Sequence, residues 1–415
     1  MRTRLSVLDE GHVRTGLPET IGLAALFSGP PPSPAEMRSR VADRWSGLDR
    51  MNLVLRPPAG PGALTGHRWE HLRAFDPTAH VTADDQALEP LLATAVGQRL
   101  PAGRPLWRLV VAPNAVPGGE HAVVLLAHHA LLDGRSLEGV FRLLMDDPPP
   151  RRRPATTPTR PAVPPAALWR ELRGSCARAQ SLPPGAPGEV APSLAVLGID
   201  PQVMRAARRR LAEGRGATLN ELLVSSFAGA LRACYGPLRA WPAGPVRFHA
   251  TVPVDLRDGH TAHRLGNAAT TVRVPLPVDT ECPDDRLRTV QGLMAALPRR
   301  ADVHRAALPV LESAGRLLPW LTHAMARHGV RADVTASGCT AFKWRDVTAS
   351  LYGRRLTRII AVPKLSPPGT ANLCLVQTGD AYALTVVGHL RPNAATALAR
   401  ATARDLAEPA AATVG

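Results

Sequence analysis

Lysine is almost absent from this chain of 415 residues, which contains only Lys343 and Lys364. Arginine therefore supplies nearly all the positive charge behind a formal net charge of +16. Aromatic residues are also scarce, at 4%, and so offer little for the base-stacking surface of a nucleic-acid-binding protein. Arginine, alanine and proline are all abundant, as in chains translated from GC-rich genomes. We interpret the charge as a scattered, solvated arginine surface and expect no nucleic-acid partner. The alternative is a surface that attracts an anionic partner.

Cysteine is scarce and widely spaced, and long apolar runs are missing. The five cysteines include no CxxC pair and are odd in number, which supports neither a zinc site nor a disulfide framework. They are Cys176, Cys234, Cys282, Cys339 and Cys374. No apolar run approaches the roughly 20 residues that span a bilayer, and the N-terminus lacks the apolar region of a signal peptide. We expect a soluble, cytoplasmic protein with no metal and no integral membrane segment.

Helix and strand signals are present in both halves of the chain. Residues 33–45 begin with Ser33, Pro34 and Glu36, a capping box with proline at the first helical position. A second capping box opens residues 218–236, and Gly236 stops that helix. Apolar or alternating strands are expected in several places, which are 20–28, 121–129, 246–257, 267–277, 358–364, 372–380 and 381–390.

A proline-rich stretch divides the chain. Residues 146–193 are too rich in proline for continuous helix or interior strand, apart from a short helix near 166–179. We expect an N-terminal lobe over 1–145, a linker or crossover over 146–193, and a C-terminal lobe over 194–415. Because strands and helices occur on both sides, the predicted fold class is α/β, with mixed sheets flanked by helices in two lobes.

Two adjacent histidines end the apolar run at 121–129, and Asp133 and Gly134 follow closely. Adjacent strand residues point to opposite faces, so only one of His128 and His129 can enter a given cleft. An imidazole that is held in a cleft and titrates near neutrality is suited to act as a general base. We expect Gly134 to permit a tight turn and Asp133 to hold the local geometry through a buried ion pair. The simpler interpretation is a structural histidine pair.

Other chemistries fit this stretch less well. Zinc needs three or four converging ligands, whereas adjacent strand residues diverge. A serine nucleophile would need a GxSxG elbow, which is missing. His128 and Asp133 also fit the HxxxxD spacing of membrane glycerolipid acyltransferases, but the membrane segments expected beside that pattern are missing.

Residues 128–134 match the HHxxxDG signature of the superfamily of condensation domains and CoA-dependent acyltransferases. Three further stretches resemble the bacterial wax ester synthase/diacylglycerol acyltransferase family. Residues 104–111 resemble its PLW element, 218–232 its TxNDxxL helix, and 252–277 its PVSLR and LGN region. The order and approximate spacing agree over roughly residues 5–395. The chain is identified as a divergent member of that family.

The chain departs from the family pattern in several places. Asn220 is followed by Glu221 where the family has Asn-Asp, and residues 335–344 lack the family's proline turn. The opening segment, residues 9–22, lacks the usual acidic and aromatic residues, and the chain is short for the family. These departures favour a role in specialised or natural-product metabolism over storage-lipid synthesis.

The resemblance implies two chloramphenicol-acetyltransferase-like lobes with the active-site cleft between them. It also implies transfer of an acyl group from a thioester, on CoA or on the phosphopantetheine of an acyl-carrier protein, to a small alcohol or amine. His129 would be the general base, with His128 beside it, and no separate cofactor is implied.

The resemblance further implies that Asp133 pairs with an arginine of the second lobe, for which we choose Arg257. The backbone amide of Gly134 would lie near the oxyanion. In supporting roles, Asn220 would cap and orient its helix, and Trp107 would be a core residue. Two alternatives remain open. One is a stand-alone condensation enzyme that forms amides or esters from carrier-bound substrates, and the other is a non-catalytic scaffold.

Overall fold

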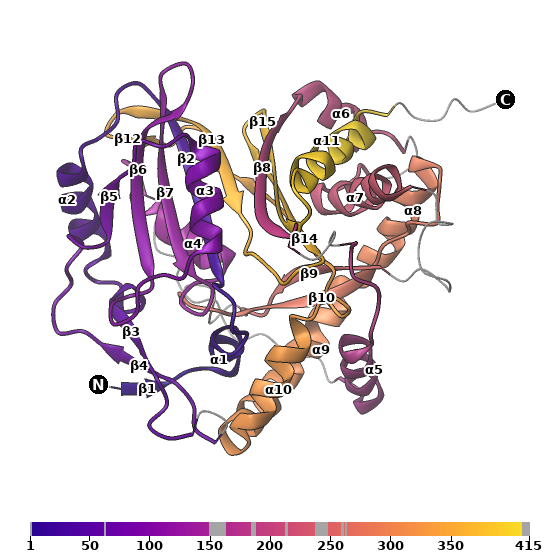
Figure 1. The fold of residues 1–415 in the computed structure, drawn as a ribbon, viewed down its shortest axis with the longest axis horizontal. Helices are drawn as coiled ribbons and strands as arrows, with labels where there is room; N and C mark the ends of the chain where they lie inside the picture. Colours follow the sequence, from indigo (N-terminus) through magenta and orange to yellow (C-terminus); the bar gives the residue numbers. More distant parts are fainter. Residues whose placement is uncertain are drawn as a thin grey trace.

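Two six-stranded sheets, one in each lobe, organise the computed structural model, which describes residues 2–61, 64–148, 163–183, 188–211, 215–236, 248–258, 261 and 264–408 (Figure 1). In spatial order, the first sheet consists of β12 (Ser350–Leu351), β13 (Arg354–Val362), β2 (Thr20–Ser28), β7 (Glu120–His128), β6 (Trp107–Val116) and β5 (Val81–Ala83). The second consists of β10 (Ala269–Pro275), β9 (His249–Asp255), β11 (Ser337–Trp344), β14 (Thr370–Thr378), β15 (Ala381–Leu390) and β8 (Ala191–Ile199). A small third sheet joins β1 (Arg2–Arg4), β4 (Arg68–His71) and β3 (Leu53–Arg56). The predicted fold class, two lobes of mixed sheets flanked by helices, is confirmed.

The helices cover the outer faces of the two sheets and fill the space between them. The first lobe contains α1 (Val7–Val13), α2 (Pro34–Trp45), the 3-10 helix η1 (Asp49–Asn52), α3 (Leu88–Gly97) and α4 (Gly134–Arg142). The rest of the chain contributes α5 (Pro165–Cys176), α6 (Pro201–Arg208), α7 (Leu219–Tyr235), α8 (Pro283–Met294), α9 (Leu297–Leu317), α10 (Pro319–Gly329) and α11 (Ala394–Ala407). Among the described residues, no helix combines the length and apolar character needed to cross a membrane.

The helix signals identified in the sequence are present as hydrogen bonds. Ser33 and Glu36 form a complete capping box at the start of α2, and Thr218 and Glu221 form one at the start of α7. Gly236 ends α7 with a φ of 79°, a left-handed conformation that glycine adopts without steric cost. The expected short helix in the proline-rich stretch is α5. The long pair α9 and α10 was not predicted, because neither start has a side-chain cap and Pro309 lies inside α9.

The first sheet draws strands from both ends of the chain. After residue 349 the chain returns to the N-terminal lobe, where β13 pairs with β2 and β12 pairs with β13. The chain then crosses into the second sheet as β14. The proline-rich stretch at 146–193 therefore does not separate all strands of one sheet from those of the other, although it follows the N-terminal strands and ends within β8. Because β13 returns to the first sheet, Lys364, which follows Val362, lies beside Glu19 at the start of β2.

Three apolar clusters hold the layers together. One lies in the first lobe, on the face of the first sheet that packs against α2 and α4. A second fills the C-terminal lobe around α7 and α11. The third lies between the sheets and includes Leu88, Leu91 and Leu92 of α3 together with Ala383 and Val387 of β15. β2 and β7 are buried almost throughout and most of β6 is buried as well, so the ends of these strands extend directly from the core.

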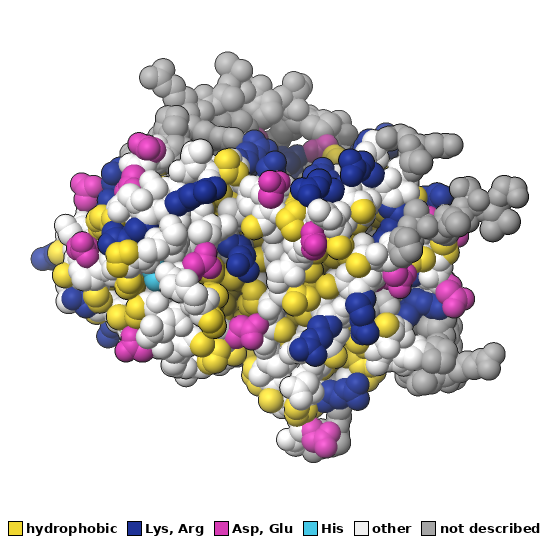
Figure 2. All heavy atoms as spheres, turned by 90° about the horizontal axis from the view of Figure 1, so that it is seen from above, with side chains coloured by type: hydrophobic (Ala, Val, Ile, Leu, Met, Phe, Trp, Pro, Cys, Tyr) yellow, Lys and Arg dark blue, Asp and Glu magenta, His cyan; other side chains and the backbone are white. Residues whose placement is uncertain are grey.

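The arginine-rich surface is mixed. On the face shown in Figure 2, arginine side chains are interspersed with acidic and apolar ones and do not merge into one basic patch. This distribution agrees with the interpretation of the net charge as a scattered surface property.

Candidate active site between the lobes

The histidine pair lies where β7 ends. His128 is the last residue of β7 and pairs in register with Thr20, the first residue of β2. The next residue, His129, donates its backbone N–H to the carbonyl of Glu19 over 2.8 Å. The pairing of β2 with β7 therefore sets the backbone position of His129.

His128 has a structural contact within the turn that follows β7. Its Nδ1 accepts a hydrogen bond of 3.1 Å from the backbone N–H of Ala130, so that nitrogen carries no proton. Burial lowers the pKa of His128 to about 4, because the charged imidazolium loses solvation. His128 is consequently neutral near pH 7 and stabilises the turn.

The ring of His129 stacks on the ring of His12. The centroids are 3.9 Å apart and the planes differ by 9°. Nδ1 of His129 is buried and makes no hydrogen bond to another described residue. Burial lowers the pKa of His129 well below its usual value, with His12 and Lys364 adding positive potential and Glu19 opposing it. His129 is therefore a neutral imidazole at pH 7, the form that can accept a proton.

Asp133 and Arg257 meet across the two lobes. Nη1 of Arg257 lies 2.8 Å from Oδ2 of Asp133, and both side chains are at most 2% exposed. The same carboxylate accepts the N–H of Ser136 at the start of α4 and the N–H of Ala268 in the second lobe. The hydrogen bond and charge of Asp133 outweigh the effect of burial and raise the pKa of Arg257.

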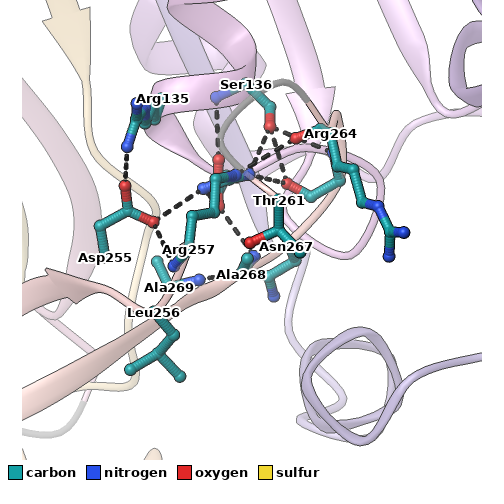
Figure 3. Close-up of polar contacts among 12 residues, drawn as sticks. Arg135, Ser136, Asp255, Leu256, Arg257, Thr261, Arg264, Asn267, Ala268 and Ala269 are labelled. Atoms are coloured by element: carbon teal, nitrogen blue, oxygen red, sulfur yellow. Dashed lines mark hydrogen bonds and ion pairs between the residues drawn. The ribbon is translucent and has the colours of Figure 1, made fainter. Parts of the chain in front are cut away.

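A polar network surrounds this ion pair (Figure 3). Arg257 reaches from the end of β9 to Oγ of Ser136 and to the carbonyl of Gly266. Ser136 in turn donates to that carbonyl and accepts the N–H of Gly266. Asp255 lies between Arg257 and the more exposed Arg135 and pairs with both. The start of α4 is therefore tied to the second lobe by several hydrogen bonds at once.

Gly134 does not have the steric role expected from the sequence. It is the first residue of α4, its φ is not positive, and an added Cβ would meet no atom within 4 Å. The prediction that the turn itself demands glycine was wrong, since Asp133 makes the turn as a helix N-cap. Gly134 instead leaves open space at the N-terminus of α4. Its N–H makes no hydrogen bond to another described residue.

Asn220 does not cap α7. Thr218 is the N-cap, and Oδ1 of Asn220 accepts the N–H of Ala341 in β11 over 2.7 Å. The side chain therefore ties α7 to the second sheet. Residues 335–344, where the family's proline turn was sought, contain the whole of that strand, β11.

Trp107 is a core residue, as expected. It is 2% exposed, and its indole N–H donates to the carbonyl of Met51 over 2.8 Å. The indole also stacks on His80 and meets the edge of Trp45. None of these contacts involves His128 or His129.

Sequence reasoning missed three residues beside His129, which are His12, Glu19 and Lys364. Glu19 is completely buried and accepts hydrogen bonds from His12 and Lys364. The available signals were weak. Lys364 is one of only two lysines in the chain, and Glu19 directly precedes a buried strand. Among the described residues, no cluster of His, Cys, Asp and Glu could hold a metal ion.

Comparison with protein families identifies the family of this chain. The model of the wax ester synthase/diacylglycerol acyltransferase catalytic domain matches residues 5–270, a span that includes the histidine pair, Asp133 and Arg257. The chain belongs to this family. The resemblance seen in the sequence motifs is therefore confirmed.

Curated members of the family are distant relatives of this protein. This chain is 27% identical over 338 residues to a putative diacylglycerol O-acyltransferase of Mycobacterium bovis. The matched region covers 68% of this chain and 64% of the relative. The chain is 24% identical over 333 residues to a probable diacylglycerol O-acyltransferase of Mycobacterium tuberculosis, covering 69% of each. The chain thus spans 64% of the length of the first relative.

Solved structures show the same fold along nearly the whole chain. The wax ester synthase/diacylglycerol acyltransferase of Marinobacter aquaeolei VT8 has a TM-score of 0.61 at 16% identity, covering 97% of this chain and 98% of that one. The first condensation domain of the calcium-dependent antibiotic synthetase has a TM-score of 0.65 at 17% identity, covering 99% and 98%. The trichothecene 15-O-acetyltransferase of Fusarium sporotrichioides has a TM-score of 0.67 at 10% identity, covering 98% and 94%.

Breaking the buried ion pair will destabilise this family member strongly. Asp133→Asn keeps an N-cap for α4 but removes the charge, and Arg257→Met removes the guanidinium. Each single change strands one buried polar partner and should lower the free energy of unfolding by about 3–5 kcal/mol. The double variant should lose less than the sum of the two, as measured by urea denaturation.

The exposed pair between Arg135 and Asp255 supplies a control, because such pairs contribute about 1 kcal/mol or less. Arg135→Ala should therefore change stability little. Additive losses for Asp133→Asn and Arg257→Met would show that the two side chains do not depend on each other.

Proposed function

We propose that this protein transfers an acyl group from a thioester to a hydroxyl acceptor, forming an ester, with His129 as the general base. The main support is a neutral, partly buried imidazole fixed at the end of β7, directly before a loop that Asp133 ties to the second lobe. Membership of the family and the diacylglycerol O-acyltransferase names of the relatives support the same reaction class.

The proposed chemistry is a direct transfer. His129 accepts the hydroxyl proton through Nε2 while the acceptor oxygen attacks the thioester carbonyl. The tetrahedral intermediate then collapses, the carbon–sulfur bond breaks, and the imidazolium returns its proton to the departing thiolate. The products are an ester and a free thiol, and His129 is neutral again. Holding both substrates in one cleft supplies much of the acceleration, and no acyl-enzyme forms.

We assign the oxyanion contact to the backbone N–H of Gly134. This amide is at the start of α4, where helix N–H groups are unpaired and the helix dipole is positive. The absence of a side chain at this position leaves room for a substrate. Asp133 and Arg257 would not touch substrate, because their polar atoms are occupied by each other and by the start of α4.

The donor would carry its acyl group on CoA or on the phosphopantetheine arm of an acyl-carrier protein, and the protein itself would need no bound cofactor. The mixed arginine surface offers cations to the phosphates of either donor. The departures from the family motifs favour an acceptor from specialised metabolism over a storage lipid.

Product analysis by mass spectrometry tests this function. The purified protein is incubated with acyl-CoA and acyl-carrier-protein donors against a panel of alcohols and amines. Ester formation supports the proposal, whereas amide formation from carrier-bound donors alone would favour a condensation-type enzyme. No product with any pair would favour a scaffold.

Removal of the proposed base should abolish most of the turnover. His129→Ala is expected to lower kcat by roughly 100- to 10,000-fold, the usual contribution of a positioned acid–base group, with donor KM little changed. His128→Ala is the matched control, because His128 supports the turn only, and should cost less. Equal small losses in the two variants would remove the assignment of His129.

The burial of His129 also predicts the pH dependence. A base with a lowered pKa stays unprotonated until the pH falls below that lowered value. We therefore expect kcat/KM to hold as the pH is reduced from 8 through about 6.5, the usual pKa of histidine. A decline centred near pH 6.5 that disappears in a His129 variant would show that the base is not desolvated.

A further inference from the structure

Glu19 occupies an unusual place directly before β2. Its side chain is completely buried, and its φ of 53° lies in the left-handed region, which costs a residue with a Cβ some strain. Glycine would adopt this conformation without strain but would supply no carboxylate. A strained residue with a buried charge at this position indicates that its side chain is needed there.

The carboxylate of Glu19 connects two segments that are distant in sequence. Both oxygens lie 2.9 Å from Nζ of Lys364, which follows β13 at the crossover to the second sheet. Oε2 also lies 2.8 Å from Nδ1 of His12. Burial opposes ionisation of Glu19, but Lys364 and His12 outweigh it and lower the pKa of the carboxyl below its usual range.

The ionised carboxylate fixes the proton on His12. Because Glu19 can only accept, Nδ1 of His12 must donate, which leaves Nε2 without a proton in the neutral ring. The ring is thereby held in one orientation, stacked on His129 at 3.9 Å. Glu19 acts on His129 a second time, since its backbone carbonyl accepts the N–H of that residue. One residue therefore sets both the backbone of His129 and the ring that covers its face.

We propose that Glu19 and His12 are positioning residues for His129, with Glu19 anchoring His12 and the His12 ring fixing the plane of the His129 imidazole. His129 has no carboxylate on its own Nδ1 among the described residues, since Asp133 is turned toward Arg257. The support that a carboxylate often gives a catalytic histidine is here supplied indirectly, through a second ring. Lys364 completes the arrangement by neutralising Glu19.

This inference rests on the proposed function, and three variants test it. His12→Ala removes the stacked ring, His12→Phe keeps a flat ring without nitrogen, and Glu19→Gln removes the charge that fixes His12. We expect His12→Ala to lower kcat by about 10- to 100-fold, the scale of a misplaced catalytic group, with donor KM changed less than about threefold. His12→Phe should restore kcat to within about fivefold of the unmodified protein, and Glu19→Gln should fall between the two.

A spectroscopic measurement separates positioning from folding. In protein labelled with ¹³C and ¹⁵N at histidine, the stacked ring should shift the His129 ring-proton resonances upfield. That shift should persist in His12→Phe, vanish in His12→Ala and weaken in Glu19→Gln.

Three results would overturn the inference. The first is an unchanged kcat in His12→Ala, and the second is an equal loss of kcat in His12→Phe and His12→Ala. The third is a His129 ring-proton resonance that is not shifted upfield in the unmodified protein. The second would make His12 a proton-transferring group in its own right. Failure of the proposed function is distinguishable, because either no product then forms with any donor and acceptor or His129→Ala retains activity, and the His129 ring-proton shift still tests the stacking without turnover.

Discussion

The ion pair between Asp133 and Arg257 is the constraint on which the rest of the site depends. Two opposite charges at most 2% exposed are tolerable only because each finds further hydrogen-bond partners, from Ser136, Gly266 and Ala268. The same carboxylate caps α4, so the interaction that joins the lobes also fixes the loop after the histidines. A substrate held against His129 would therefore meet a backbone that is already fixed on the side of the first lobe.

The second constraint is the pairing of β2 with β7. Because Thr20 is opposite His128, the residues just outside the paired strands, Glu19 and His129, meet as well. The carbonyl of Glu19 positions the proposed base, and its carboxylate gathers His12 and Lys364 on one side of it. Desolvation keeps His129 neutral, whereas Glu19 provides a nearby negative charge that opposes this effect. The neutral state of His129 and the nearby charge of Glu19 both follow from the place where β2 begins and β7 ends.

Local signals in the sequence predicted much of the fold. Capping boxes at Ser33 and Thr218, and apolar runs for β2, β7 and the final strands, depend on neighbouring residues and were confirmed. The partner of Asp133 came from the family resemblance, because local patterns do not specify contacts between lobes. Glu19 and Lys364 are 345 positions apart, and their meeting depends on β13 returning to the first sheet. No local pattern predicts such a return, so this part of the site required the structure.

The central claim is that the acyl group passes directly from donor to acceptor while His129 acts as the general base. Intact-protein mass spectrometry tests it most directly, after rapid mixing with an accepted thioester donor and quenching, without acceptor and then with it. Direct transfer predicts an unmodified protein mass at every time point, with product appearing only once acceptor is added. A protein mass increased by one acyl group, formed without acceptor and lost as product appears, would contradict the account.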